Sequence, residues 1–376
     1  MWYHPAGLRI LLDYRPALRQ RTGVGEYAHH LATALRPQLG DGDSLTLFSS
    51  SWTDRLRRDA VPGAATLDVR VPVQLLNLAW HRLGWPPVER LGAATDVAWS
   101  LHPLLMPSTR AAQFVTVHDL YFLDHPETTT GEVRRDYPAL AGPHARRADG
   151  VIVISEYSRD LVISRLGVPG DRVTVCYPGP PAWPRRGEPA AGGPILHVGT
   201  IGPRKNVNAI IKAYLTLGRR HPDVPPLVFA GGAGAPVASL LGGDDHELFH
   251  RKVRFAGYVD DEERLRLYRE ASMLVMASTD EGFGIPALEA MTIGLPVIAA
   301  RRGALPEVLG AAGILVDPDD RDALASAMEH VLLDAPLRRQ LVADGFVQAA
   351  RFSWDTSAAR LLQAFRDGVD RRRRRP

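Results

Sequence analysis

Two glutamates eight positions apart, Glu281 and Glu289, are the side chains in this sequence best suited to chemistry. The run that begins at Glu281 reads Glu-Gly-Phe-Gly-Ile-Pro and follows a short apolar stretch. Glycines let backbone N–H groups approach a ligand, Pro286 suits the start of a helix, and a helix N-terminus favours an anion. Carboxylates on both sides of an anion fit a ligand with a sugar at each end, because each carboxylate can accept paired hydroxyl hydrogen bonds. The alternative is a pair of acids placed near a helix start by the dipole alone.

A second cluster, at 197–206, places Gly199 in a turn after an apolar strand and two adjacent cations, Arg204 and Lys205, at a helix start. Cations beside helix N–H groups favour a diphosphate. The chain has only three lysines, Lys205, Lys212 and Lys252, so a lysine at a motif position carries more weight than one of the many arginines. The alternative is a solvated Arg-Lys pair.

The first half of the chain contributes two weaker candidates. His118 ends an apolar strand, where α/β sheets bind their ligands, although a capping histidine would look the same. Gly23 and Gly25 match the spacing of a dinucleotide fingerprint. About nine residues separate them from the preceding strand, and no acidic residue follows the next strand, so a loop that approaches a phosphate or sugar is favoured over a nicotinamide site. A plain helix start is the remaining alternative.

Short β-rich runs alternate with helical runs in both halves, which predicts two α/β domains with parallel sheets that face each other across a cleft. The predicted strands are 8–13, 44–48, 66–71, 97–100, 113–118, 150–154, 172–175, 195–198, 227–230, 253–255, 273–276, 296–299 and 313–316. The clearest predicted helices are 25–35, 130–147, 156–166, 207–219, 261–270, 286–293, 321–332, 336–348 and 354–369. The predicted organisation is an N-terminal domain at 1–178, a Pro/Gly-rich linker at 179–193, a second domain at 194–353, a helix at 354–370 that crosses back to the first domain, and a basic tail at 371–376.

Composition narrows the class of protein. The 376 residues are 45% apolar and 23% charged, which is an ordinary globular composition. Without the five arginines Arg371–Arg375, the count is 40 basic against 42 acidic residues, so the near-neutral body does not suggest nucleic-acid binding. The single cysteine gives no sign of an oxidising compartment, and neither a signal peptide nor a long apolar run is present. We expect a cytoplasmic protein, with the arginine tail as the feature suited to contact with the inner face of a membrane.

The motifs together resemble those of the retaining GT-B glycosyltransferases of family 4, also called glycosyltransferase group 1, and most closely their bacterial mannosyltransferases. The resemblance extends over nearly the whole chain and is most specific between Leu196 and Asp317. It is carried by Thr22-Gly23-Val24-Gly25, Val153-Ile154-Ser155-Glu156-Tyr157-Ser158, Pro203-Arg204-Lys205-Asn206, Glu281-Gly282-Phe283-Gly284-Ile285-Pro286-Ala287-Leu288-Glu289, Gly294-Leu295-Pro296-Val297-Ile298-Ala299 and Gly303-Ala304-Leu305-Pro306-Glu307-Val308. It implies the GT-B fold, in which two facing Rossmann-like domains enclose an interdomain cleft.

The resemblance also implies roles for individual residues. Glu289 would hold the ribose of the nucleotide, and Glu281 would contact the donor sugar. The Arg204-Lys205 pair would bind the diphosphate, His118 would face the reacting sugar, and the loop with Gly23 and Gly25 would close on the donor phosphates and the acceptor. The remaining donor-binding positions are Gly199, Gly282, Phe283, Gly284 and Ile285. Many members carry an arginine where this chain has Thr200, and Arg204 is expected to supply that charge.

These roles predict a hexosyltransferase that moves mannose from GDP-mannose to a hydroxyl of a glycan or lipid-linked acceptor, with a UDP-sugar such as UDP-glucose as the alternative donor. No D-x-D motif lies at a strand end, so we expect neither a metal nor another cofactor. Three other classes are weaker. A nicotinamide-dependent oxidoreductase would use the loop at Gly23, a glycoside hydrolase would use the two glutamates, and a membrane-surface module would use the arginine tail.

Overall fold

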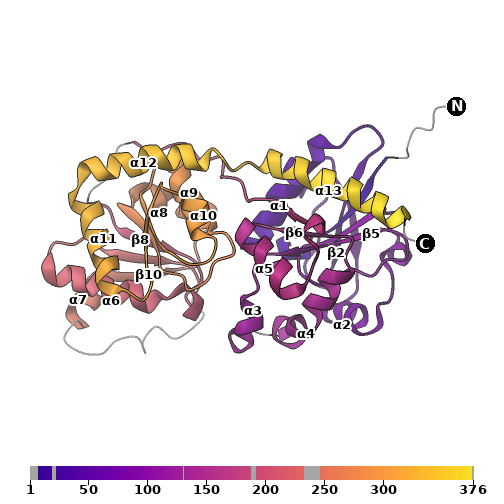
Figure 1. The fold of residues 1–376 in the computed structure, drawn as a ribbon, viewed down its shortest axis with the longest axis horizontal. Helices are drawn as coiled ribbons and strands as arrows, with labels where there is room; N and C mark the ends of the chain where they lie inside the picture. Colours follow the sequence, from indigo (N-terminus) through magenta and orange to yellow (C-terminus); the bar gives the residue numbers. More distant parts are fainter. Residues whose placement is uncertain (1–6, 19–22, 130, 188–191, 233–245, 375–376) are drawn as a thin grey trace. The chain divides into compact units, whose positions relative to one another are not determined.

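The computed structural model describes residues 7–18, 23–129, 131–187, 192–232 and 246–374 of the chain. The chain divides into two compact units, each described here by itself (Figure 1). Unit 1 comprises Met1–Pro178 together with Ser353–Pro376, and unit 2 comprises Gly179–Phe352. Each unit is a doubly wound α/β layer structure built on one parallel sheet, which confirms the predicted fold class.

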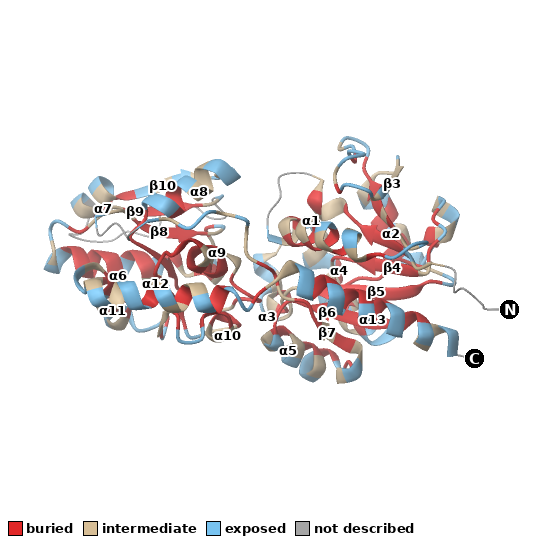
Figure 2. Cartoon of the chain, turned by 90° about the horizontal axis from the view of Figure 1, so that it is seen from above, coloured by how far each residue is buried: buried red, intermediate tan, exposed pale blue. Residues whose placement is uncertain are grey.

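Unit 1 is organised around a seven-stranded sheet in the order β3-β2-β1-β4-β5-β6-β7, with every pair parallel. Its strands are β1 (Arg9–Asp13), β2 (Ser44–Ser50), β3 (Ala65–Val69), β4 (Val97–Ser100), β5 (Ala112–Val117), β6 (Gly150–Val153) and β7 (Val173–Val175). The central strands β4, β5 and β6 are buried along their whole length, as expected for a parallel sheet covered on both faces (Figure 2). All seven correspond to strands predicted from the sequence.

The helices of unit 1 include one from the far end of the chain. They are α1 (Gly23–Leu35), α2 (Val73–Leu83), α3 (Tyr121–Asp124), α4 (Gly131–Arg147), α5 (Glu156–Leu166) and α13 (Trp354–Arg374). Helix α13 packs against α1 and against β5, β6 and β7, and its buried Phe365 meets the rings of Phe114 and Trp99. The helix was predicted to end near 370, with 371–376 as a separate tail. It continues instead to Arg374, and Arg371 Nη2 donates a hydrogen bond to the backbone carbonyl of Asp149 at 3.0 Å.

Unit 2 has a six-stranded parallel sheet in the order β10-β9-β8-β11-β12-β13. Its strands are β8 (Ile195–Val198), β9 (Leu227–Ala230), β10 (Val253–Gly257), β11 (Met273–Met276), β12 (Val297–Ala300) and β13 (Ile314–Val316). Its helices are α6 (Val207–Arg220), α7 (His246–Lys252), α8 (Asp261–Glu270), α9 (Ile285–Ile293), α10 (Leu305–Leu309), α11 (Arg321–Leu333) and α12 (Ala335–Ala349).

The strand order of unit 2 reverses between β8 and β11, which are neighbours in the sheet although β9 and β10 lie between them in the chain. Loops that leave such a pair at the carboxyl ends of the strands diverge and leave a crevice, where doubly wound sheets bind ligands. The segment after β8 contains Gly199 and Lys205, and the segment after β11 contains Glu281. The topology therefore brings two of the sequence motifs to one edge of the sheet.

The segment 179–193 was predicted to be a linker; its described residues, 179–187 and 192–193, belong to unit 2. Arg186 donates from its backbone N–H to the carbonyl of Ile293 at 3.0 Å and from Nη1 to that of Ala271 at 2.5 Å. The guanidinium of Arg185 lies 4.1 Å from the centroid of the Phe346 ring. These contacts fix the backbone, so we name 179–187 the anchored segment.

None of the helices in the described ranges is long and apolar enough to cross a membrane.

Candidate active site

The loop between β11 and α9 is shaped by glycines. Gly284 immediately precedes α9 with φ of 107°, and a Cβ there would lie 2.8 Å from Leu305 Cδ2. Only glycine adopts that conformation without strain. Pro286 is the second residue of the helix, one position later than predicted, and its fixed φ suits the first turn. Gly284 is the N-cap residue and has no side chain to cap the helix, whose positive dipole end lies at this loop.

A cation pairs with the first glutamate. Lys205 Nζ donates to Glu281 Oε2 at 2.6 Å, and Arg204 Nη1 lies 3.9 Å from the same oxygen. Lys205 and Glu281 are only 9% and 8% exposed. Burial raises the pKa of Glu281, but the charges of Lys205 and Arg204 outweigh it and hold this pKa below its usual value. The site therefore contains an ionised carboxylate next to two cations that can also attract phosphate oxygens.

The backbone of Glu281 is held by the loop between β12 and α10. Ala304 donates its N–H to the Glu281 carbonyl at 2.8 Å, and Gly303 has φ of 58°. A Cβ on Gly303 would lie 2.5 Å from that carbonyl oxygen, so glycine is required by the close approach. The Phe283 side chain is buried in unit 2, where its ring meets that of Phe352 edge to face, with the ring centroids 5.4 Å apart. Only the backbone of Phe283 is therefore left for a ligand.

The second glutamate is held by another helix. Glu289, 5% exposed on α9, accepts a hydrogen bond from the Tyr268 hydroxyl at 2.8 Å, and Arg264 Nη2 lies 3.5 Å from its other oxygen. Both partners belong to α8. The two glutamates are therefore buried carboxylates with basic neighbours, which is the arrangement that a ligand rich in hydroxyls and phosphates requires.

The turn after β8 is tightly packed beside Lys205. Gly199 has φ of 149°, and a Cβ on it would lie 3.3 Å from Lys205 Cε and 3.7 Å from His197 Nε2. His197 donates from Nδ1 to the Val275 carbonyl at 2.9 Å, and burial lowers its pKa to about 4. This histidine is therefore neutral and keeps Nε2 as an acceptor next to the cation.

In unit 1, His118 follows β5 and faces Tyr27, with ring centroids 5.3 Å apart. Its Nε2 donates to the Leu101 carbonyl at 3.1 Å, which leaves Nδ1 as an acceptor. Burial lowers the pKa of His118 to about 4. Near neutral pH this residue therefore offers a neutral imidazole to a ligand.

The two glycines of the N-terminal motif differ. Gly23 is the exposed first residue of α1, whereas Gly25 is buried and a Cβ on it would lie 2.6 Å from the Pro16 carbonyl oxygen. Helix packing alone therefore accounts for glycine at 25. Thr22 lies outside the described residues.

One group of three side chains in the described ranges has the chemistry of a metal site, namely His81, Glu132 and Asp136 in unit 1. The Arg135 guanidinium donates to both oxygens of Asp136, at 3.0 and 2.7 Å, and the Asn77 amide donates to Glu132 at 2.6 Å. Since these donors already engage the carboxylates, the group is explained as a hydrogen-bond network.

The comparisons with known proteins agree with this chemistry. Residues 187–371 match the family described as glycosyl transferases group 1, and residues 21–180 match glycosyltransferase family 4. The O-antigen chain mannosyltransferase B of Escherichia coli is 30% identical over 96% of this chain and 100% of its own length. The chain belongs to the family 4 glycosyltransferases. It is therefore a hexosyltransferase, and the nicotinamide and hydrolase hypotheses are set aside.

Solved structures place this glycosyltransferase in the GT-B fold. Sucrose-phosphate synthase from Thermosynechococcus elongatus superposes with a TM-score of 0.72 at 20% identity, over 96% of this chain and 98% of that one. The Anabaena protein HepE, solved with UDP and glucose, gives a TM-score of 0.68 at 19% identity over 95% and 98% of the two chains. As a glycosyltransferase, the protein binds a nucleotide-sugar donor and a glycan acceptor.

Within unit 2 the glycosyltransferase brings together Arg204 and Lys205 with Glu281, and it places Gly199 beside Lys205. The loop before α9 contains Gly282, Phe283 and Gly284, and Ile285 begins the helix that carries Glu289. His118, Gly23 and Gly25 belong to unit 1. Sequence reasoning missed Arg264 and Tyr268, and it placed Gly303 in a motif of the resemblance without assigning it a role. Arg264 and Tyr268 lie four positions apart in a predicted helix, which is a signal for a shared face, but nothing local indicates that the face meets Glu289.

Proposed function

We propose that this glycosyltransferase transfers mannose from GDP-mannose to a hydroxyl of a glycan or lipid-linked acceptor, with retention of the anomeric configuration and without a metal. The observation that carries the proposal is the buried Lys205–Glu281 pair, with Arg204 beside it. The similarity to the mannosyltransferase of Escherichia coli supports mannose.

In the proposed reaction, the bond between sugar C1 and the leaving phosphate oxygen breaks, and the acceptor oxygen bonds to C1 on the same face. The leaving phosphate accepts the proton of the acceptor hydroxyl. Arg204, Lys205 and the N-terminus of α9 stabilise the charge that grows on the diphosphate, which removes the need for a divalent cation. Glu281 accepts hydrogen bonds from hydroxyls of the transferred sugar, and Glu289 accepts hydrogen bonds from the ribose hydroxyls. The neutral His118 is a hydrogen-bonding group for the sugar.

Thermal-shift measurements with GDP, UDP, GDP-mannose and UDP-glucose test the donor. We expect GDP and GDP-mannose to stabilise the protein most, and preferential stabilisation by UDP-glucose would replace the proposed donor with the alternative. Turnover with the preferred donor should persist in EDTA, whereas its loss would contradict metal independence. The anomeric configuration of the product, read by NMR, tests retention.

The proposal also covers the acceptor and the cellular location of the reaction. We place the reaction on the cytoplasmic side, with a lipid-linked acceptor reached at the inner face of the membrane. The arginines at the end of α13 are a weaker anchor than expected, because Arg371 and Arg372 contact Asp149. Binding to anionic vesicles that is lost in a chain ending at 370 would support docking by these arginines.

A further inference from the structure

The carboxylate of Glu289 is contacted on both oxygens by one face of α8. Tyr268 Oη donates to Oε2 at 2.8 Å, and Arg264 Nη2 lies 3.5 Å from Oε1. The two residues are four positions apart, so a single helical face presents both. A carboxylate has about four acceptor positions. Contact with the two α8 donors is therefore compatible with hydrogen bonds from ribose hydroxyls to the same carboxylate.

The chemical states of the partners suit this task. Tyr268 is fully buried, and burial together with the adjacent carboxylate raises its pKa well above the usual value. The hydroxyl therefore remains a donor at every working pH. Arg264 places a positive charge 3.5 Å from a carboxylate that is itself 5% exposed.

The anchored segment holds the α8 face from the other side. The Arg264 guanidinium lies 5.4 Å from the centroid of the Trp183 ring, and the rings of Trp183 and Tyr268 are 5.6 Å apart. Asp261 Oδ1 also forms an ion pair with Arg264 Nη2, at 3.1 Å. These contacts restrict the rotamers of both side chains, so Glu289 meets preoriented donors.

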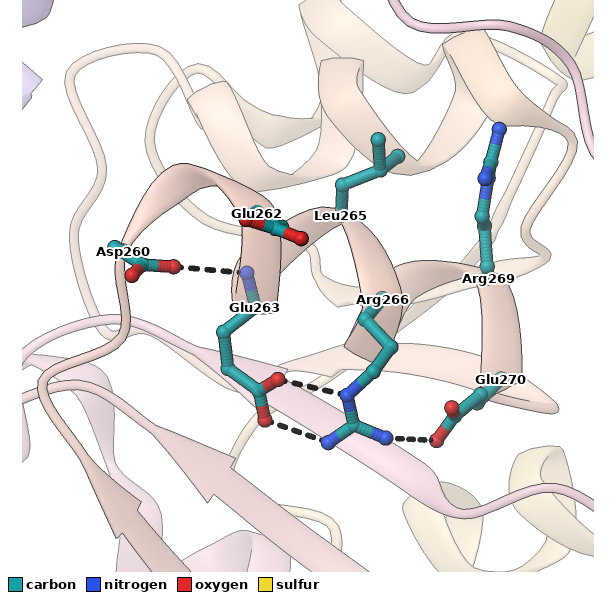
Figure 3. A pocket seen from close by; sticks show the side chains of 7 residues that line it. All are labelled: Asp260, Glu262, Glu263, Leu265, Arg266, Arg269 and Glu270. Atoms are coloured by element: carbon teal, nitrogen blue, oxygen red, sulfur yellow. Dashed lines mark hydrogen bonds and ion pairs between the residues drawn. The ribbon is translucent and has the colours of Figure 1, made fainter.

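The outer face of α8 provides a contrast (Figure 3). Arg266 pairs there with Glu263 and Glu270, at 2.6 Å each, in a shallow pocket lined by charged side chains. These charges satisfy one another near solvent, where ion pairs contribute little. Arg266 is thus a matched arginine on the same helix, and its partners among the described residues, Glu263 and Glu270, lie outside the proposed donor site.

We propose that Tyr268 and Arg264 are positioning residues of the donor site, which hold the Glu289 carboxylate in the orientation that accepts the ribose hydroxyls. The inference rests on the proposed function, because that function assigns the ribose to Glu289. It adds that nucleotide recognition depends on a helix that touches no substrate in the proposed assignment.

The test compares a nucleoside diphosphate with its 2′,3′-dideoxy counterpart by isothermal titration, using GDP or UDP, whichever the wild-type protein binds. In the wild type the dideoxy nucleotide should bind more weakly. Tyr268→Phe and Arg264→Gln should each weaken the natural nucleotide about tenfold, the scale of one hydrogen bond to a charged group. Neither change should alter the affinity for the dideoxy nucleotide, and Arg264→Lys should restore part of the loss.

Two variants are matched controls. Tyr214→Phe removes another buried hydroxyl of unit 2, which donates to the Pro225 carbonyl at 2.8 Å, and Arg266→Gln removes the outer arginine. Both should leave the ratio of the two affinities unchanged. Arg264 retains 21% side-chain exposure, so its variants carry the test even where Tyr268→Phe fails to fold.

The outcomes separate the inference from the proposed function. Equal weakening of both nucleotides by Tyr268→Phe and Arg264→Gln would overturn the positioning role, while the ribose assignment survives if Glu289→Gln still abolishes the discrimination. If the wild type binds both nucleotides equally, or if Glu289→Gln keeps the wild-type ratio, the assignment of Glu289 to the ribose fails and the inference fails with it.

Discussion

Each glutamate of the proposed donor site has a basic neighbour. Glu281 is paired with Lys205, and Glu289 lies beside Arg264. A buried carboxylate without such a partner would cost several kcal/mol, roughly, and would take up a proton instead. The pairing with Lys205 holds Glu281 in its ionised form, in which it is an acceptor for hydroxyl groups, and Arg264 places a positive charge beside Glu289.

We predict that Lys205→Ala and Glu281→Ala each lower kcat at least about 100-fold, the scale of removing one group that stabilises the transition state. Lys205→Ala removes a cation from the proposed diphosphate site, and Glu281→Ala removes an acceptor of the donor sugar. Steady-state kinetics with the preferred donor measures the effect. Lys212→Ala, an exposed lysine on α6, is the control and should retain full activity. Near-wild-type turnover in either site variant would refute its role.

Gly303→Ala should disturb Glu281, because the two residues are in contact although they are far apart in the sequence. The new Cβ would lie 2.5 Å from the Glu281 carbonyl oxygen, at a position with φ of 58°. We expect a loss of about 1–3 kcal/mol in the free energy of unfolding, with lower turnover because the loop must shift. Gly192→Ala is the control, because nothing lies within 4 Å of its Cβ position and its φ is not positive. Equal stabilities of the two variants in urea unfolding would count against the close approach.

Helix α13 completes unit 1 through an aromatic contact. The buried Phe365 meets Phe114 at 4.8 Å and Trp99 at 5.5 Å, both edge to face. A Cβ on Gly368, one turn later, would lie 2.4 Å from the Phe114 ring. The helix therefore sits close to the sheet and forms part of the core of unit 1.

Phe365→Ala should destabilise unit 1 by about 3–5 kcal/mol, the usual cost of removing a buried aromatic ring. Tryptophan fluorescence during urea unfolding reports on the change, because Trp99 lies against Phe365. Val347→Ala on α12, at a side chain 72% exposed, should cost less than 1 kcal/mol, about the size of an ordinary surface change. A similar small effect for Phe365→Ala would show that α13 is dispensable for the fold.

The strands of both sheets could be predicted because each is a short apolar run bounded by turn residues. Helix α2 was missed; three of its leucines, Leu75, Leu78 and Leu83, are exposed and so lie off the face that the helix buries. The contact of Tyr268 with Glu289 could not be predicted, because it depends on how two helices pack and not on either sequence alone.

Buried histidines should make the protein sensitive to mild acid. Burial lowers the pKa values of His118 and His144 in unit 1 and of His197 in unit 2, each to about 4. These residues take up protons near pH 6.5 when unfolded but only near pH 4 when folded. Between pH 6.5 and pH 4 the unfolded chain thus binds more protons than the folded one. The free energy of unfolding is therefore highest above pH 6.5 and falls as the pH decreases toward 4.

At pH 5 the decrease in the free energy of unfolding that comes from His197 alone is about 2 kcal/mol, at 1.36 kcal/mol for each pKa unit. Urea unfolding between pH 7 and pH 5 measures the decline. His330→Gln, at an exposed histidine of α11, should leave its slope unchanged. A free energy of unfolding that stays constant over this range would contradict neutral burial of these imidazoles.

The chain order of the two units has a consequence for synthesis. Unit 1 needs α13, yet all of unit 2 is translated between Pro178 and Ser353. At about 5–20 residues per second, this interval lasts roughly ten to forty seconds. Throughout this interval the apolar surface around Phe114 lacks the helix that covers it. By the time α13 is synthesised, all of unit 2 has been translated. Unit 2 is therefore expected to fold first, and nascent unit 1 is the part that a chaperone would need to shield.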